Sequence, residues 1–70
     1  MKLSARNQLK GTILSIEEGA VNGIVKLDIG GGNVITSTIS MASIRELGLQ
    51  VGGAAYAVIK ATSVMMAVED

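Results

Sequence analysis

The sequence predicts an all-β fold with one short helix, and three observations favour this class. Apolar and polar residues alternate over most of the 70 residues, which is the period of a strand with one buried face. Nine glycines, two of them beside Asn, fall largely between the alternating segments, where turns are expected. Only the stretch from Ser40 to Gly48 carries both the start and the stop signals of a helix.

The first predicted strand covers residues 2–17 and is bent or split in two at Gly11. Alternation places Ser4 and Arg6 on one face of this strand and turns Asn7 to the other, toward packing or a subunit contact. A glycine inside a strand indicates a bulge or the close approach of another backbone. Such a bend suits a small barrel.

The next two strands are predicted to form a hairpin. Residues 19–23, Gly-Ala-Val-Asn-Gly, form a loop, because Gly and Asn accept the positive φ angles that other residues resist. Alternating strands follow over 24–29 and 34–39, joined by a turn at 30–33. The three glycines of this turn precede neither a Gly-Lys-Ser/Thr motif nor a helix, so a plain turn is favoured over a phosphate-binding loop.

The chain ends in the predicted helix and one long β segment. Ser40 can cap the helix, Ile44 and Leu47 lie on one of its sides, and Gly48 ends it. The last β segment is predicted from Ala54 to Val68. With the first strand counted as two, the sequence predicts a five-stranded antiparallel barrel of the oligonucleotide/oligosaccharide-binding (OB) type, in a single domain.

Composition predicts a thin core that neighbouring subunits complete. A domain of this length buries only about 60% of the surface that its unfolded chain exposes. The chain has no Cys for disulfides and no His for a common zinc site, and its single aromatic residue is Tyr56. Oligomerisation is therefore the expected reinforcement.

Most enzyme classes are excluded by the same composition. Thiolate and imidazole nucleophile systems are absent, and the carboxylates are spread over separate segments without a pair suited to acid–base work. Zero net charge and one aromatic residue argue against nucleic-acid binding. The start of the chain has no signal-peptide pattern, which predicts a cytoplasmic protein with no membrane partner.

Two cations and several hydroxyls favour an oxyanion site. Taken alone, Lys60 is best explained as a lysine in an edge strand whose side chain extends to solvent, and Arg6 as an ordinary surface cation. Each, however, has a hydroxyl two residues away, at Thr62 and Ser4 respectively. Ser40 and Ser43 add two hydroxyls at a helix start. Two cations and several hydroxyl donors together are the groups that would bind a tetrahedral oxyanion.

Three motifs resemble those of the molbindins, a family of small molybdate-binding proteins. They are Ser-Ala-Arg-Asn-Gln-Leu-Lys-Gly-Thr at 4–12, Gly-Ala-Val-Asn at 19–22 and Val-Ile-Lys-Ala-Thr-Ser-Val-Met at 58–65. The resemblance covers essentially the whole chain, 1–70, as one molybdate-binding domain of the TOBE type. It implies an OB-like barrel, strand exchange between subunits, and a homohexamer built as a trimer of dimers.

The resemblance also implies the ligand and its contacts. The ligand is molybdate, with tungstate as an analogue, no organic cofactor, and no metal coordinated directly by side chains. The interface site would take residues from two subunits: Ser4, Arg6, Lys60 and Ala61 from one, and Ser40, Ser43 and the backbone of Ile44 from the other. A second site on the threefold axis would use the loop residues Ala20, Val21 and Asn22. Position 40 is often Thr in this family, so Ser40 keeps the hydroxyl and loses a methyl group.

Three functions remain open at this point. The first is non-catalytic storage or buffering of molybdate in the cytoplasm. The second is a structural or regulatory oligomerisation domain in which any anion is a structural ion. The third, disfavoured by the charge and the lack of stacking aromatics, is an OB-like nucleic-acid-binding module.

Overall fold

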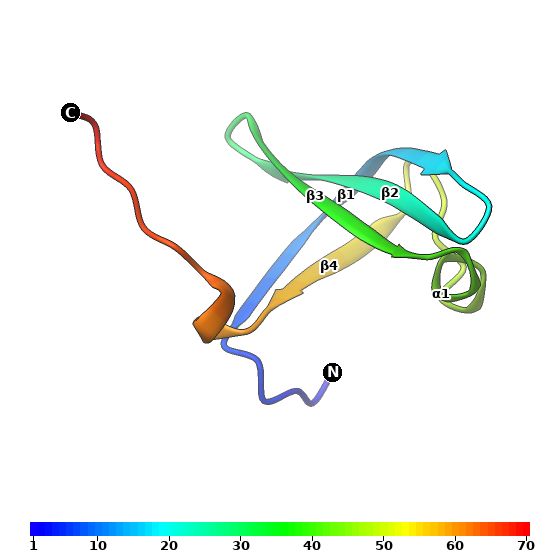
Figure 1. The fold of residues 1–70 in the computed structure, drawn as a ribbon, viewed down its shortest axis with the longest axis horizontal. Coiled ribbons are helices and arrows are strands. Elements are labelled where there is room, and N and C mark those ends of the chain that lie inside the picture. Colours follow the sequence, from blue (N-terminus) through cyan, green and yellow to red (C-terminus); the bar gives the residue numbers. More distant parts are fainter.

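The computed structural model describes all residues, 1–70, and contains four strands, one α-helix and a short 3-10 helix (Figure 1). In chain order the elements are β1 (Asn7–Glu18), β2 (Asn22–Gly30), β3 (Asn33–Ser40), α1 (Met41–Glu46), β4 (Ala54–Ile59) and the 3-10 helix η1 (Ala61–Ser63). The prediction of a mostly-β fold with one short helix is confirmed. The prediction of five strands is wrong for this chain, which forms four.

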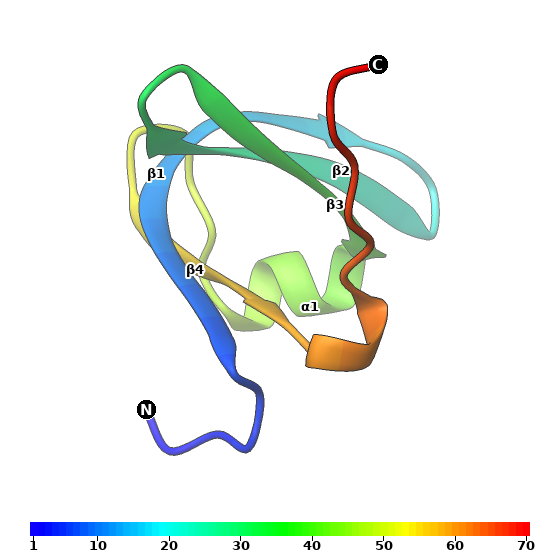
Figure 2. The ribbon, with the colours of Figure 1, turned by 90° about the vertical axis from the view of Figure 1, so that its left-hand side faces the viewer.

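The four strands form one curled antiparallel sheet in the order β3-β2-β1-β4. The long strand β1 changes partner near its middle, since it pairs with β4 from Asn7 to Thr12 and with β2 from Thr12 to Glu18. A register irregularity between Ile13 and Ser15 adds to the bend. The sheet therefore curls like an OB barrel, with β3 and β4 as its two free edges (Figure 2).

The beginning of β1 differs from the prediction. The strand is continuous rather than split, and it starts at Asn7, so residues 1–6 lie outside the sheet and the expected strand face shared by Ser4 and Arg6 is not formed. The physical reason is the lack of a partner, because β4 ends opposite Asn7. Gly11 proves to be a close backbone approach, since a Cβ there would meet the carbonyl oxygen of Asp28.

The last β segment is shorter than predicted. Burial alternates along β4 as expected, but the strand ends at Ile59 instead of Val68. The chain then turns through η1, and residues 64–70 are exposed and run away from the sheet (Figure 1). Lys60 is therefore the N-cap of η1 and does not lie within a strand.

The β2–β3 hairpin agrees with the sequence. Its turn contains three glycines with φ between 64° and 94°, and Oδ1 of Asp28 accepts a hydrogen bond from the Gly30 amide at 2.9 Å. The plain turn is thus confirmed. The β1–β2 loop is shorter than predicted, because Asn22 and Gly23 already belong to β2.

Helix α1 begins and ends as predicted, and the residue that follows it, Leu47, is exposed. Ser40 is the N-cap, and Gly48, with φ of 64°, follows the C-cap residue Leu47. Met41 and Ile44 are buried, whereas Leu47 is 69% exposed. Leu47 is the C-cap residue, one position after the helix ends at Glu46, and it lines an open apolar groove.

The core is thin, as composition predicted. Only six of 70 residues are buried, and the apolar ones are Ile13, Val25, Leu27, Met41 and Ile44. A groove of about 690 Å³ lies open between the free edges β3 and β4, and thirteen of its fifteen lining residues are hydrophobic. The single α-helix is too short to cross a membrane.

Candidate functional site

The two candidate cations lie next to the last rung of the β1–β4 ladder. That rung joins Asn7 to Ile59, so Arg6 is the residue just before β1 and Lys60 is the residue just after β4. Both side chains are exposed. The register therefore places two residues that are 54 positions apart in the sequence (60 minus 6) next to the same rung.

Two further predicted residues lie at this same end. Ser4 is two residues before Arg6, and Ala61 is the first residue of η1, directly after Lys60. Both are exposed. We refer to Ser4, Arg6, Lys60 and Ala61 as the cationic half-site.

The predicted hydroxyl pair lies at the start of α1. Oγ of Ser40 accepts a hydrogen bond from the Ser43 amide at 3.0 Å and donates one to Oγ of Ser43 at 2.9 Å. Both serines are partly buried, and the Ile44 side chain is 5% exposed in the core, so Ile44 offers a ligand only its backbone. We refer to Ser40, Ser43 and Ile44 as the hydroxyl half-site.

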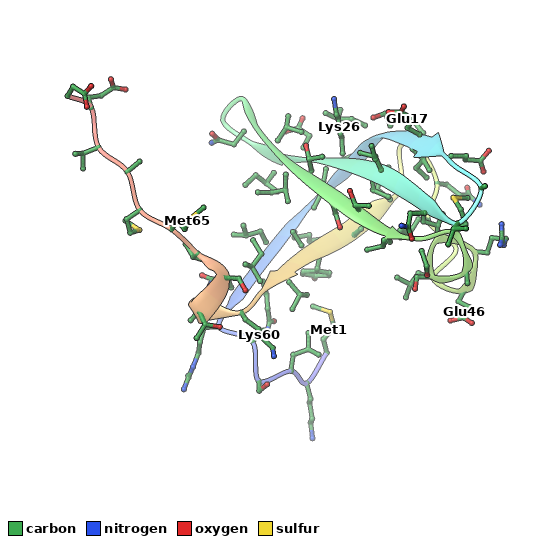
Figure 3. All side chains as sticks on the ribbon, viewed as in Figure 1. Met1, Glu17, Lys26, Glu46, Lys60 and Met65 are labelled. Atoms are coloured by element: carbon green, nitrogen blue, oxygen red, sulfur yellow. The ribbon has the colours of Figure 1, made fainter.

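The two half-sites lie at opposite ends of the sheet. Ser40, the last residue of β3, pairs with Asn22, the first residue of β2, and β2 begins just after the far end of β1. The cationic half-site lies at the other end, where β1 begins. In Figure 3, Glu46 on α1 lies at the right of the view, and Lys60 lies well away from it, near the lower middle. One chain therefore does not assemble the complete set of predicted ligands.

The candidate loop residues lie near α1. Ala20, Val21 and Asn22 are exposed, and the carbonyl oxygen of Val21 accepts a hydrogen bond from the Met41 amide at 2.8 Å. This bond fixes the β1–β2 loop to the start of the helix. The loop thus lies at the same end of the molecule as the hydroxyl half-site.

Charge is distributed unevenly between the two ends. Glu17, Glu46 and the cation Arg45 lie toward the α1 end of the sheet, whereas Lys60 directly follows the last strand of the sheet, away from α1 (Figure 3). The four residues of the cationic half-site include no carboxylate. No group of three or more His, Cys, Asp or Glu side chains is arranged to hold a metal ion. The chemistry that these residues offer is hydrogen bonding and charge neutralisation toward an anion.

Asn7 plays a part that the sequence analysis did not identify. Its Nδ2 donates a hydrogen bond to the carbonyl oxygen of Ile59 at 3.2 Å, across the last rung between β1 and β4. Its position on the face opposite Arg6 was predicted, but the partner could not be known before the register of the two strands was known. The signal in the sequence was a polar amide at an inward-facing position of an apolar pattern.

Comparisons with known proteins identify relatives over nearly the whole chain. A family model described as the TOBE domain matches residues 3–66. A probable molybdenum-pterin-binding protein of Haemophilus influenzae is 67% identical over 69 residues, which cover 99% of this chain and 100% of that protein.

Solved structures show the same fold. MopII from Clostridium pasteurianum superposes with a TM-score of 0.89 at 48% identity, covering 96% of this chain and 100% of that one. The cytoplasmic molybdate-binding protein ModG, solved with molybdate bound, gives a TM-score of 0.88 at 51% identity, covering 93% of this chain and 46% of that one. The chain therefore belongs to the TOBE domain family.

Proposed function

We propose that this protein binds molybdate, with tungstate as an analogue, and acts as a non-catalytic cytoplasmic store or buffer of the oxyanion. The observation that carries the proposal is the register of the β1–β4 ladder, because Arg6 and Lys60 are the residues that flank its last rung in the sequence. Relatives named for molybdenum or molybdate support the choice of ligand, and the cytoplasmic protein ModG supports the compartment.

The charges match a dianion. At about 4 Å and an effective dielectric constant of 20, one pair of unit charges is worth roughly 4 kcal/mol. Removing a dianion from water costs several kcal/mol, and this cost has to be offset by opposite charges. One cation alone would leave half of the ligand charge uncompensated. Hydrogen bonds from hydroxyls and amides to a charged group add about 1.5 to 3 kcal/mol each. The cationic half-site therefore needs the donors of the hydroxyl half-site.

The complete site is proposed to form between two copies of the chain. Since the two half-sites lie at opposite ends of one molecule, the cationic half-site of one copy would meet the hydroxyl half-site of another. Residues 1–70 then act as one binding domain that is complete only in an oligomer.

The fifth strand of the barrel is proposed to come from a second copy. The apolar groove between β3 and β4 is bordered by two free strand edges, and the tail Val64–Val68 is extended away from its own sheet. Met66 and Val68 of that tail are 89% and 91% exposed. Exposed apolar side chains that lie close together are typical of a surface that binds a partner. Exchange of tails gives a dimer, and three dimers give the proposed homohexamer.

A second oxyanion site is proposed at the β1–β2 loop. Three copies of Ala20, Val21 and Asn22 around a threefold axis would form a ring of amide donors. The site contains no cation, so its affinity would be lower than that of the interface site. Its support is the exposure of all three residues.

Calorimetric titration of the purified oligomer with molybdate, tungstate, sulfate and phosphate tests the proposal. Molybdate and tungstate are expected to bind, and Arg6→Ala and Lys60→Ala are each expected to raise the molybdate Kd at least tenfold, the loss of one charged hydrogen bond. Lys26→Ala is the matched control, since Lys26 is an exposed cation on β2, away from both half-sites. Unchanged binding by both site variants would refute the site.

An oligomerisation domain is the second candidate, because the groove and the tail require no anion to associate. This function predicts an oligomer with equal thermal stability in the presence and absence of molybdate, and no heat of binding. The storage function predicts stabilisation by the ligand. The two outcomes are distinguished in one set of melting curves.

A further inference from the structure

The side chain of Asn7 makes a hydrogen bond between two parts of the chain that are far apart in the sequence, which no other side chain does. Its hydrogen bond to the Ile59 carbonyl joins residues 52 positions apart, whereas every other side-chain hydrogen bond joins residues two or three positions apart. It is therefore the only side-chain hydrogen bond that contributes to the tertiary structure. It lies at the last rung of the β1–β4 ladder.

This end of the sheet needs such a bond. The pairing of β1 with β2 begins only at Thr12, so from Asn7 to Gly11 β1 is paired with β4 alone. A two-stranded ribbon is marginally stable, and strand ends open locally at low cost in free energy. Arg6 and Lys60 lie just beyond the two strand ends of this ribbon, outside the ladder, and two like charges close to each other repel. Both effects tend to separate the two strand ends.

We infer that Asn7 is a positioning residue for oxyanion binding, which holds Arg6 and Lys60 at the spacing that one dianion can bridge. The inference rests on the proposed function. Asn7 itself does not point to the ligand, because its amide is directed to the Ile59 carbonyl between the strands. Its effect passes through the backbone, since the Ile59 carbonyl belongs to the peptide group that joins Ile59 to Lys60.

A neighbouring amide supports this assignment. Nε2 of Gln8 donates a hydrogen bond to the carbonyl oxygen of Ala5 at 3.0 Å, which folds the segment containing Ser4 and Arg6 back toward the start of β1. Two consecutive amide side chains thus fix the two segments of the cationic half-site: Gln8 fixes the segment before the ladder, and Asn7 fixes the one after it.

The test removes the amide donor, once with a side chain of similar size and once by truncation. Asn7→Leu and Asn7→Ala are each expected to raise the molybdate Kd about three- to tenfold, the effect of losing one neutral hydrogen bond. Asn33→Ala is the matched control: it removes an amide of the same type, bonded to the Gly30 carbonyl at 3.3 Å in the β2–β3 turn. Melting temperature and oligomer size are expected to agree with the control.

A double-mutant cycle separates positioning from general destabilisation. In the Lys60→Ala background, Asn7→Leu is expected to change the Kd less than twofold, because the residue through which it acts is gone. The inference is overturned if the Asn7 variants bind like the wild type, if their effect is undiminished in the Lys60→Ala background, or if Asn33→Ala weakens binding equally.

Amide hydrogen exchange without any oxyanion gives an independent readout. Asn7→Leu is expected to speed exchange at the Ile59 amide at least threefold, while the amides of the β2–β3 hairpin stay unchanged. If the wild-type oligomer fails to bind molybdate, the proposed function fails. In that case, hydrogen exchange alone tests whether Asn7 fixes the end of the β1–β4 ladder, and unchanged exchange in Asn7→Leu would overturn that role.

Discussion

Ser40 and Ser43 are joined by two hydrogen bonds at the start of α1. The Ser43 amide donates to Oγ of Ser40 at 3.0 Å, and the Ser40 hydroxyl donates to Oγ of Ser43 at 2.9 Å. Oγ of Ser40 thus takes part in two hydrogen bonds within the helix start, whereas Oγ of Ser43 takes part in one. Ser40 therefore serves the helix, and Ser43 is the better placed of the two to contact an anion.

A carboxylate at position 40 separates these two roles. Ser40→Asp is expected to keep the stability of the protein within about 0.5 kcal/mol, because Asp is as good an N-cap as Ser and its charge suits a helix start. The same charge repels a dianion, so the molybdate Kd is expected to rise at least tenfold. Thermal unfolding and calorimetric titration measure the two effects.

Ser40→Ala is the companion variant for this prediction. It removes the cap without adding charge and is expected to cost about 1 kcal/mol of stability. Its effect on binding is expected to be smaller than that of Ser40→Asp. Equal molybdate affinity in Ser40→Asp and the wild type would show that this end of the molecule does not meet the ligand.

The tail provides a second prediction through its alternation. If it pairs as a strand in the groove of a second copy, Val64, Met66 and Val68 face one way and Met65 and Ala67 face the other. The larger apolar set fits the apolar groove. Val68→Asp is therefore expected to dissociate the oligomer, whereas Ala67→Asp is expected to leave it assembled.

Size-exclusion chromatography with light scattering measures the assembly of these two variants. Tyr56 offers a second signal, since it lines the groove and is the single aromatic residue of the chain. Its fluorescence is expected to change in Val68→Asp only. Dissociation by Ala67→Asp alone would reverse the assigned face, and no dissociation by either variant would argue against tail exchange.

Gly11 gives a third prediction, which concerns the fold alone. A Cβ at this position would meet the carbonyl oxygen of Asp28 and would lie 2.9 Å from Cγ of Leu27. Because a backbone atom of the neighbouring strand blocks the space, Gly11→Ala is expected to destabilise the protein by about 1–3 kcal/mol. Thr12→Ala, an exposed change at the next position, is the control and is expected to cost less than about 0.5 kcal/mol. Chemical denaturation measures both, and equal stability of the two variants would contradict the role of Gly11.

The sequence was sufficient where the determinant is local. The turn at 30–33, the Ser40 cap, the Gly48 terminator and the alternation of β2 follow from neighbouring residues, and all four are found in the structure. The chain limits of β1 and β4 were predicted wrongly, because a strand extends only as far as it has a partner. The fifth strand was expected because the first strand was counted as two at Gly11, and a local pattern cannot show that one continuous strand changes partner near its middle.

The candidate site follows the same division. Arg6, Lys60 and their flanking hydroxyls were identified from residue types, and the pairing of β1 with β4 places the two cations next to the same rung. The separation of Ser40 and Ser43 from these cations is a property of the strand order, which no local pattern encodes. Asn7 was missed as a functional residue because its partner, the Ile59 carbonyl, is defined only by the register.

Ligand addition gives the final prediction. A ligand that binds only the folded assembly stabilises it by about 2.7 kcal/mol per site at 100 times its Kd. In a chain of this size, 1 kcal/mol corresponds to a shift in Tm of about 4–8 °C, so molybdate is expected to raise the Tm of the wild type by at least about 10 °C. Lys60→Ala is expected to lose most of this shift at the same molybdate concentration, and Lys26→Ala is expected to keep it, because only Lys60 flanks the same ladder rung as Arg6. Differential scanning calorimetry at several molybdate concentrations measures the shift. An equal rise in both variants would place the ligand away from the cationic half-site, and the absence of a rise in the wild type would favour the oligomerisation domain.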